Sequence, residues 1–210
     1  MNRCYHLTLL SIVLLVLLWS GIQPHDQFTW LLEVIPAIAG IILLLLTYRR
    51  FQFSKLAYFL IALHMIILMV GGHYTYAEVP LFNWVRDAFD LSRNHYDRVG
   101  HLAQGFIPAI VAREILLRLS PLRKGKLLNF IIVCICLAIS ASYELIEFLV
   151  SVLTGTAAEA FLGTQGDIWD TQMDMLMAFI GSILALLSLS SLHDKSLHQQ
   201  SIQCGSSSKL

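Results

Sequence analysis

Three short stretches of the chain carry acids and histidines at helical spacing, within or beside apolar segments. They contain Asp97 and His101, Glu144 and Glu147, and Asp167, Asp170 and Asp174. Side chains three or four residues apart share one face of a helix, so each stretch presents its ionisable groups together. Ionisable groups at membrane depth are costly and mark functional sites by default, so we expect the protein's chemistry here.

The residue types in these stretches suit acid–base catalysis or metal binding. Carboxylate oxygens suit magnesium, manganese or calcium, and an added imidazole brings zinc and iron into range. We predict catalytic roles for His101, Glu144 and Glu147, and a divalent metal held by His101, Glu144 and Asp174. The remaining ligand-binding residues are expected to be Asp97, Gln104, Asp170 and Asp174.

Simpler interpretations of the same residues stay open. The aspartates could cap helices, since acids favour helix N-termini, and buried acids could remain protonated. Arg113 and Glu114 are expected to form an interfacial pair, and His64 to be a structural histidine. Glu144 with Glu147 is the hardest pair to dismiss, because two acids on one face of an apolar helix need a partner.

The composition indicates which elements must position these residues. Of 210 residues, 57% are hydrophobic and 13% are charged, which predicts a polytopic membrane protein. The formal net charge is zero, so nothing favours nucleic-acid binding. The four cysteines, at positions 4, 134, 136 and 204, form no disulfide framework or zinc spacing and are expected to be apolar fillers.

The hydropathy pattern predicts an all-α bundle of about six membrane-spanning helices in one domain, residues 1–192. The expected spans are residues 5–20, 30–47, 56–72, 99–119, 127–153 and 173–192. The first span is expected to be a retained anchor, because no small-residue cleavage site follows it. The polar, serine-rich tail, residues 193–210, is expected to be disordered and cytoplasmic.

The orientation follows from the positive residues in the connections. Eleven of the 14 lysines and arginines fall on one predicted side, which we assign to the cytoplasm together with both termini. The three stretches then lie at one depth near the outer face, and Glu33 lies at a similar level. Residues 81–89 show helical apolar spacing, which favours either an amphipathic helix in the outer interface or a compact loop on the bundle.

The runs RNHYDRVGHLAQGF (93–106), SYELIE (142–147) and LGTQGDIWDTQMDM (162–175) resemble the YjdF family. That resemblance covers almost the whole chain and implies a multi-pass bacterial inner-membrane protein. A weaker likeness is to VanZ-like proteins. Asp97, His101, Glu144, Asp174 and Gly181 match that pattern, whereas Glu147 and Ala178 depart from it. Neither resemblance implies a reaction.

Three functions fit these residues. The first is an intramembrane enzyme or binding protein that acts on a lipid-linked or amphiphilic ligand at the outer leaflet, by hydrolysis or transfer at a headgroup. The second is a small proton-coupled transporter, which with six spans and no internal repeat would require an oligomer. The third is an accessory membrane protein whose polar layer only fixes helix packing.

Overall fold

The computed structural model describes residues 3–155, 161 and 164–207, with side chains up to residue 202. Within these residues the chain is all-α, which confirms the predicted fold class. The elements are α1 (Arg3–Ser20), α2 (Gln27–Thr47), α3 (Lys55–Tyr74), a 3-10 turn η1 (Tyr76–Glu78), α4 (Pro80–Ala88), α5 (Tyr96–Leu119), α6 (Lys126–Thr154) and α8 (Asp170–Ser207). The predicted connection between the fifth and sixth spans lies partly outside the described residues.

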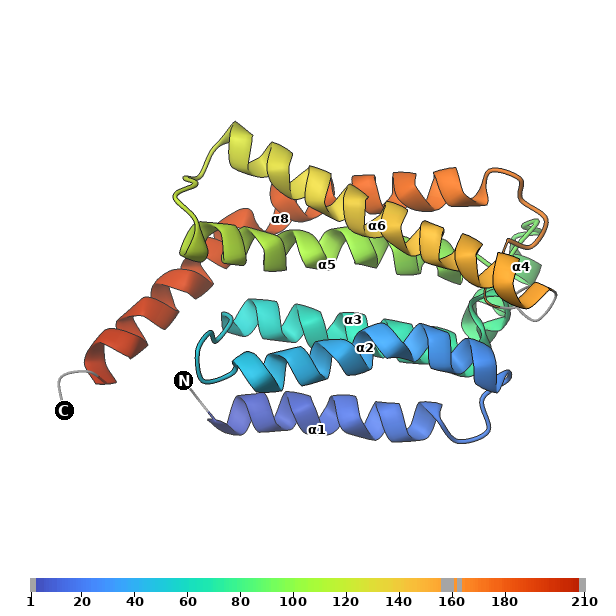
Figure 1. Ribbon diagram of the computed structural model, residues 1–210, viewed down its shortest axis with the longest axis horizontal. Helices are drawn as coiled ribbons and strands as arrows, with labels where there is room; N and C mark the ends of the chain where they lie inside the picture. Colours follow the sequence, from blue (N-terminus) through green and yellow to red (C-terminus); the bar gives the residue numbers. More distant parts are fainter. Residues whose placement is uncertain (1–2, 156–160, 162–163, 208–210) are drawn as a thin grey trace.

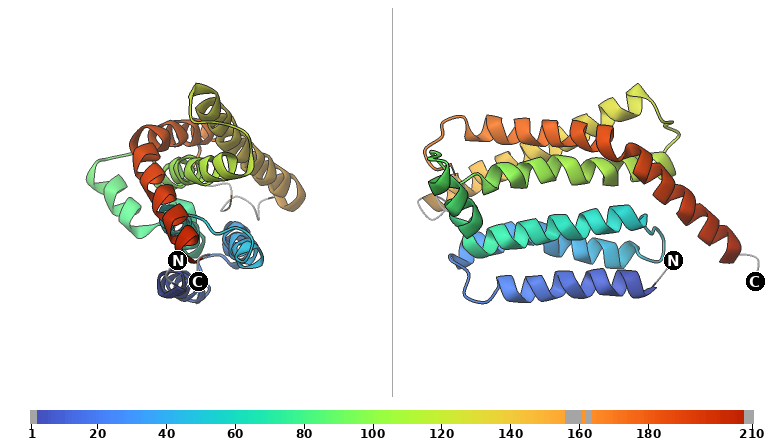
Figure 2. Two further views of the ribbon diagram at one scale, coloured as in Figure 1. Left: turned by 90° about the vertical axis from the view of Figure 1, so that its left-hand side faces the viewer. Right: turned by 180° about the vertical axis from the view of Figure 1, so that it is seen from behind.

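The long helices form two groups of three (Figure 1). α3 packs against α1 and α2, α5 packs against α6 and α8, and contact between α3 and α5 joins the groups. Both chain ends lie at one end of the bundle, which we call the terminal end, and α4 lies at the opposite end, the α4 end (Figures 1 and 2). Helices α1, α2, α3, α6 and α8 are long and apolar enough to cross a membrane.

Helix α5 differs from these five helices because it is polar, and it carries most of the residues of interest. Its 24 residues rise about 36 Å at 1.5 Å per residue, enough to cross a bilayer. Eleven of its residues are buried, and these include Asp97, Arg98, His101, Arg113 and Glu114. Contact with α3, α6 and α8 shields these polar side chains from lipid. The polar sequence of α5 therefore reflects a helix enclosed by protein.

Close contact between α5 and α8 fixes the relative positions of their side chains. A Cβ atom added to Gly105 would lie 1.8 Å from the carbonyl oxygen of Ala178, and one added to Gly181 would lie 2.1 Å from that of Leu102. The two backbones therefore touch directly, as small residues permit in membrane helices. This contact brings the acids at the start of α8 against the start of α5.

The segment around residues 81–89 forms a helix, one of the two alternatives expected for it, whereas the tail differs from the sequence expectation. The segment from residue 80 forms the short helix α4, with no buried residue, and Trp84 in it is 65% exposed. The predicted disordered tail is helical as far as Ser207. It is held because Gln200 donates to the carbonyl oxygen of Gln52 at 2.7 Å and His193 is fully buried. Polar tail residues thus satisfy groups at the start of α3.

Candidate functional site

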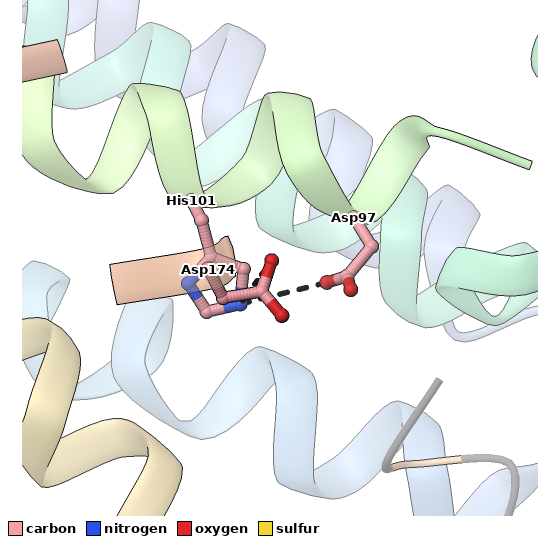
Figure 3. A group of neighbouring side chains, drawn as sticks. All are labelled: Asp97, His101 and Asp174. Carbon is pink, nitrogen blue, oxygen red and sulfur yellow. Dashed lines mark ion pairs between the residues drawn. The ribbon is translucent and has the colours of Figure 1, made fainter. Parts of the chain in front are cut away.

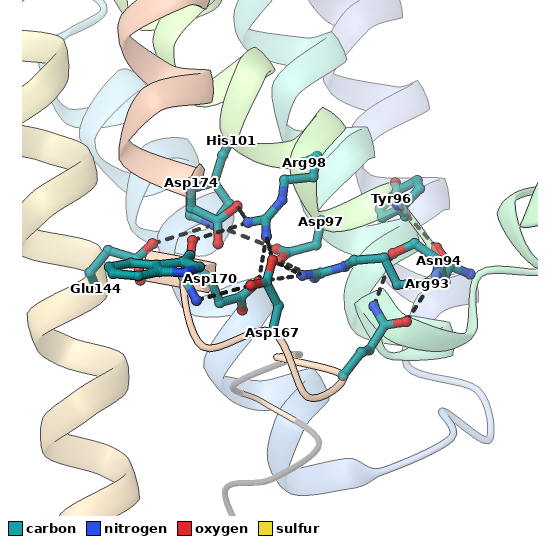
Figure 4. A network of polar contacts seen from close by, with 12 residues as sticks. Arg93, Asn94, Tyr96, Asp97, Arg98, His101, Glu144, Asp167, Asp170 and Asp174 are labelled. Carbon is teal, nitrogen blue, oxygen red and sulfur yellow. Dashed lines mark hydrogen bonds and ion pairs between the residues drawn. The ribbon is translucent and has the colours of Figure 1, made fainter. Parts of the chain in front are cut away.

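The three predicted stretches meet at the α4 end of the bundle. Asp97 and His101 lie in the first turns of α5, Glu144 lies in the last third of α6, and Asp174 lies at the start of α8 (Figure 4). All four side chains are less than a tenth exposed. Residues that were expected to lie at one depth on separate helices are therefore close together in the structure. We call the following residues the α4-end cluster: Arg93, Asp97, Arg98, His101, Glu144, Asp167, Asp170 and Asp174.

Two arginines hold the aspartates of this cluster. Arg98 donates to Asp174, to Oδ1 of Asp170 at 2.7 Å and to Oδ2 of Asp167 at 2.9 Å. Arg93 donates to Oδ1 of Asp170 at 2.5 Å and pairs with Asp97 at 3.4 Å. Such charge-assisted bonds are the stronger class, and here they tie the turn before α8 to the start of α5.

Asp167 lies in the turn that precedes α8, so the helix does not begin early enough to include it. Its Oδ1 accepts from the backbone N–H of Trp169 at 2.9 Å, and its side chain is 31% exposed. This backbone hydrogen bond, together with Arg98 and Arg93, lowers the pKa of Asp167 below its ordinary value. Asp167 is therefore held ionised at the rim of the cluster.

The centre of the cluster is Nε2 of His101. It lies 3.5 Å from Oδ1 of Asp97, 3.6 Å from Oε1 of Glu144 and 3.9 Å from Oδ1 of Asp174 (Figures 3 and 4). The other ring nitrogen, Nδ1, lies 3.1 Å from Oε1 of Gln104. Donation from Nδ1 to that oxygen leaves the lone pair of Nε2 facing three carboxylates. A hydrogen bond of this kind on the second nitrogen is typical of metal-ligating histidines.

Two further observations mark this centre as a candidate metal centre. Ligand atoms of Asp97, His101 and Asp174 all lie within 4.8 Å of one another. Oε1 of Glu144 is buried and has no hydrogen-bond partner within the described part of the chain. A buried carboxylate oxygen without a partner is unfavourable unless a cation or proton lies beside it.

A small cavity of about 20 Å³ adjoins this centre. It is lined by Glu33, Leu68, Tyr76, Asp97, Gly100, His101, Gln104, Tyr143 and Glu147. Tyr143 donates to Oε2 of Glu33 at 3.1 Å. Such a volume is sufficient for about one water molecule. Every residue predicted to be catalytic or ligand-binding thus belongs to the cluster or lines this cavity.

The charges at this end are unbalanced within the described residues. Six buried carboxyl groups gather here, and two buried guanidinium groups oppose them. The carboxyl groups are those of Glu33, Asp97, Glu144, Glu147, Asp170 and Asp174, and the guanidinium groups those of Arg93 and Arg98. Buried charges must be paired, protonated or bound to metal, so this layer requires additional positive charge.

A second polar cluster lies at the terminal end, where the sequence predicted only an interfacial Arg113–Glu114 pair. That pairing is wrong: the fully buried Glu114 accepts from Ser54 N–H and Oγ at 2.7 Å each, from Arg118 at 2.7 Å and from His193 at 3.0 Å. Arg113 instead lies 2.9 Å from Nδ1 of His193 and 2.8 Å from Asp194. We call these six residues the terminal-end cluster.

Sequence reasoning missed residues that line the small cavity and members of the terminal-end cluster. Tyr76 and Tyr143 line the cavity, but tyrosines in apolar segments give no signal that separates them from core residues. His193 was assigned to the tail, although its position four turns after Ala178 on a continuous helix would have placed it beside α5. His73, at the end of α3, contacts the carbonyl oxygen of Ser20 at 3.0 Å and packs against Trp19.

Known proteins resemble this chain over almost its whole length. Residues 5–195 match a family described as "Predicted membrane protein (DUF2238)". The chain is 50% identical over 185 residues to "Inner membrane protein YjdF" of Escherichia coli (strain K12), a match that covers 88% of each protein. No solved structure matches the chain.

These relationships confirm the resemblance to the YjdF family, whereas the VanZ-like resemblance gains no support from them. Together with five helices that are apolar and long enough to span a bilayer, they identify a multi-pass protein of a bacterial inner membrane. The chain belongs to the DUF2238 family of membrane proteins.

Proposed function

We propose that the α4-end cluster binds one divalent cation through Asp97, His101, Glu144 and Asp174, and that the bound ion acts on the headgroup of an amphiphilic ligand. The observation that carries this proposal is the position of Nε2 of His101, which faces three carboxylate oxygens at 3.5–3.9 Å. Arg98 already donates to Asp174 and Arg93 pairs with Asp97, whereas Oε1 of Glu144 is buried without a hydrogen-bond partner within the described residues. A further positive charge beside Nε2 of His101 would satisfy that oxygen.

The distances favour a metal ion over a direct hydrogen bond. A charge-assisted N–H···O bond is about 2.7–2.9 Å long, shorter than all three contacts. Two ligand atoms that each lie about 2.1 Å from a tetrahedral zinc ion are about 3.4 Å apart. The separations from Nε2 of His101, 3.5–3.9 Å, are close to that value. The ligand atoms of Asp97, His101 and Asp174 all lie within 4.8 Å of one another, and Glu144 is placed beside this group by its 3.6 Å separation from Nε2. One imidazole with three carboxylates is a ligand set suited to zinc, iron or manganese.

The surroundings favour chemistry on an amphiphile. The cavity beside Asp97 and His101 accommodates a water molecule, which a bound cation would activate by lowering its pKa. Glu147 lines the same cavity and is the candidate base. Ile168 and Trp169, next to the aspartates of the turn before α8, are 84% and 60% exposed. Exposed apolar residues beside a polar site suit a ligand that has both a headgroup and a hydrocarbon chain.

Thermal unfolding of the purified, metal-stripped protein tests the metal site. Addition of zinc or manganese is expected to raise the midpoint temperature, because an ion that binds only the folded state stabilises it. Glu144→Gln is expected to remove that rise. Asp90→Asn, which removes an exposed acid at the same end of the bundle, is the matched control and is expected to retain it.

Lipid mass spectrometry on the same purified sample tests the ligand. A headgroup-bearing amphiphile that copurifies with the wild-type protein, and is depleted in Glu144→Gln, would support the second half of the proposal. If no divalent ion changed the midpoint temperature of the wild-type protein, the proposal of a metal site would be wrong.

One observation favours a second candidate, a proton-coupled carrier. Nε2 of His64 is buried without a hydrogen-bond partner among the described residues, and His64 lies halfway along α3. It therefore adds an ionisable group at a depth between the two polar clusters. Substrate-dependent proton flux in proteoliposomes that disappears in both His64→Gln and Glu144→Gln would favour this candidate over the metal-dependent one.

A further inference from the structure

An additional cavity lies between α1 and α2 and is closed on one side by α3. Both helices pack on α3, and the space between them is an apolar cavity of about 90 Å³. Its walls include Leu10, Val13, Ile41 and Met65. For comparison, an engineered apolar cavity of about 150 Å³ holds benzene. The cavity therefore has room for a short stretch of hydrocarbon chain.

The apolar cavity continues into a wider, polar groove at the terminal end. This groove has a volume of about 700 Å³, and it shares four lining residues with the cavity: His6, Leu10, Leu45 and Tyr48. Its charged lining residues are Arg3, at the start of α1, and Arg49, just after the end of α2. No acid lines either space within the described part of the chain.

Two polar atoms of the cavity wall have no hydrogen-bond partner among the described residues. They are Nε2 of His6 and the hydroxyl oxygen of Tyr58, and both atoms are buried. The other ring nitrogen of His6 lies 2.8 Å from the hydroxyl of Tyr48, so the histidine is held in place. Buried polar atoms are normally satisfied, so these two indicate a polar partner supplied from outside the chain.

We propose that this groove binds one anionic phospholipid of the adjoining leaflet. Arg3 and Arg49 would bind the phosphate, because a guanidinium group presents paired donors to phosphate oxygens. His6 and Tyr58 would donate to the ester region, and one acyl chain would lie in the apolar cavity. The positive residues also place this end of the bundle on the expected cytoplasmic side, where anionic lipids attract basic groups.

Native mass spectrometry of the full-length protein, released from nanodiscs, tests this site. One nanodisc preparation contains phosphatidylglycerol and the other contains only phosphatidylcholine. The test variant is Arg3→Gln with Arg49→Gln. The matched control is Arg50→Gln with Arg123→Gln, which removes two exposed positive charges from the same end without altering the groove lining.

We expect one phosphatidylglycerol per wild-type chain and at least a tenfold lower bound fraction in the Arg3/Arg49 variant, with the control unchanged. Phosphatidylcholine is expected to dissociate from all three proteins. Equal retention of phosphatidylglycerol by all three proteins, or equal retention of both lipids, would overturn the proposal. If inorganic phosphate raised the thermal midpoint as much as the lipid does, the ligand would be free phosphate and the lipid assignment would be wrong.

Discussion

The two polar clusters of this protein both draw on α5 and α8 and on similar residues, yet they differ in how their acids are satisfied. In the terminal-end cluster, both oxygens of the single buried acid, Glu114, receive hydrogen bonds from protein donors. In the α4-end cluster, six buried acids meet two arginines, and Oε1 of Glu144 has no partner within the described residues. The first arrangement is complete without a ligand, whereas the second leaves carboxyl groups that need either protons or a bound cation.

The histidines of the two clusters show the same difference. At the terminal end Arg113 donates to Nδ1 of His193, so Nε2 carries the proton and donates it to Glu114. In the α4-end cluster, Nδ1 of His101 faces Gln104, and Nε2 faces carboxylates that lie beyond hydrogen-bond distance. We therefore interpret the terminal-end cluster as a structural connection and the α4-end cluster as a ligand site.

The largest expected effect comes from breaking the terminal-end cluster. Glu114→Ala leaves Ser54, His193 and Arg118 without their shared acceptor, and loss of one partner from a buried ion pair costs about 3–5 kcal/mol. Chemical unfolding in detergent micelles would measure this loss. Unchanged stability of Glu114→Ala would show that this cluster is not structural.

Both clusters depend on the close contact between α5 and α8, so a substitution at this contact is expected to weaken both. Gly105→Ala places a Cβ against the backbone of α8, so the helices must separate at a cost of about 1–3 kcal/mol or more. Gly40→Ala is the control, because its Cβ would meet only the flexible end of Met65 at 2.8 Å. Thermal unfolding of both variants measures the difference, and equal midpoints would contradict direct backbone contact.

Removing one acid from each cluster is expected to change the free energy of unfolding in different directions. In metal-stripped protein, Glu144→Gln is expected to leave stability unchanged or to raise it by about 1 kcal/mol, because it removes an uncompensated buried charge. The matched change Glu114→Gln is expected to lower stability, since it removes a charge that is fully paired. Chemical unfolding of the two variants in the presence of a chelator tests this contrast. A loss of stability in both variants would contradict the proposed difference between the clusters.

The smallest effect is expected at the rim of the α4-end cluster. Because the pKa of Asp167 is lowered in the folded protein, its contribution to stability is present above the unfolded pKa, about 3.9, and is lost as pH falls below it. Asp167→Asn should therefore be slightly less stable than the wild type at pH 7, and this difference should shrink as pH falls from the unfolded pKa through the lower pKa of the folded protein. A stability difference that persists at low pH would contradict the ionic role of Asp167.

Much of the α4-end cluster could be predicted from the sequence because local spacing and helix direction together determine depth. Asp97 with His101 and Glu144 with Glu147 share faces, and alternating helix directions place both pairs at one level. The terminal-end cluster could not be predicted in this way. Ser54, Glu114 and His193 lie 60 and 79 residues apart along the chain, and no spacing rule links them.

The last helix extends further than the sequence predicted, to Ser207 instead of residue 192. The tail from residue 193 is polar, and composition alone predicts no reason for it to be ordered. In the fold, polar tail residues contact backbone groups at the start of α3 and just before it, which a composition argument cannot detect. The ion pairs that Arg93 and Arg98 form with the aspartates could not be predicted either, because they depend on the conformation of the turn before α8.

Metal analysis of the purified protein shows whether the α4-end cluster binds a divalent cation. The sample is loaded with zinc, passed through a desalting column and analysed for zinc per chain, alongside Glu144→Gln and Glu114→Gln. We expect about one zinc ion per wild-type chain, at least a tenfold loss in Glu144→Gln and full retention in the folded fraction of Glu114→Gln. Absence of zinc from the wild-type protein, or equal zinc in wild type and Glu144→Gln, would contradict it.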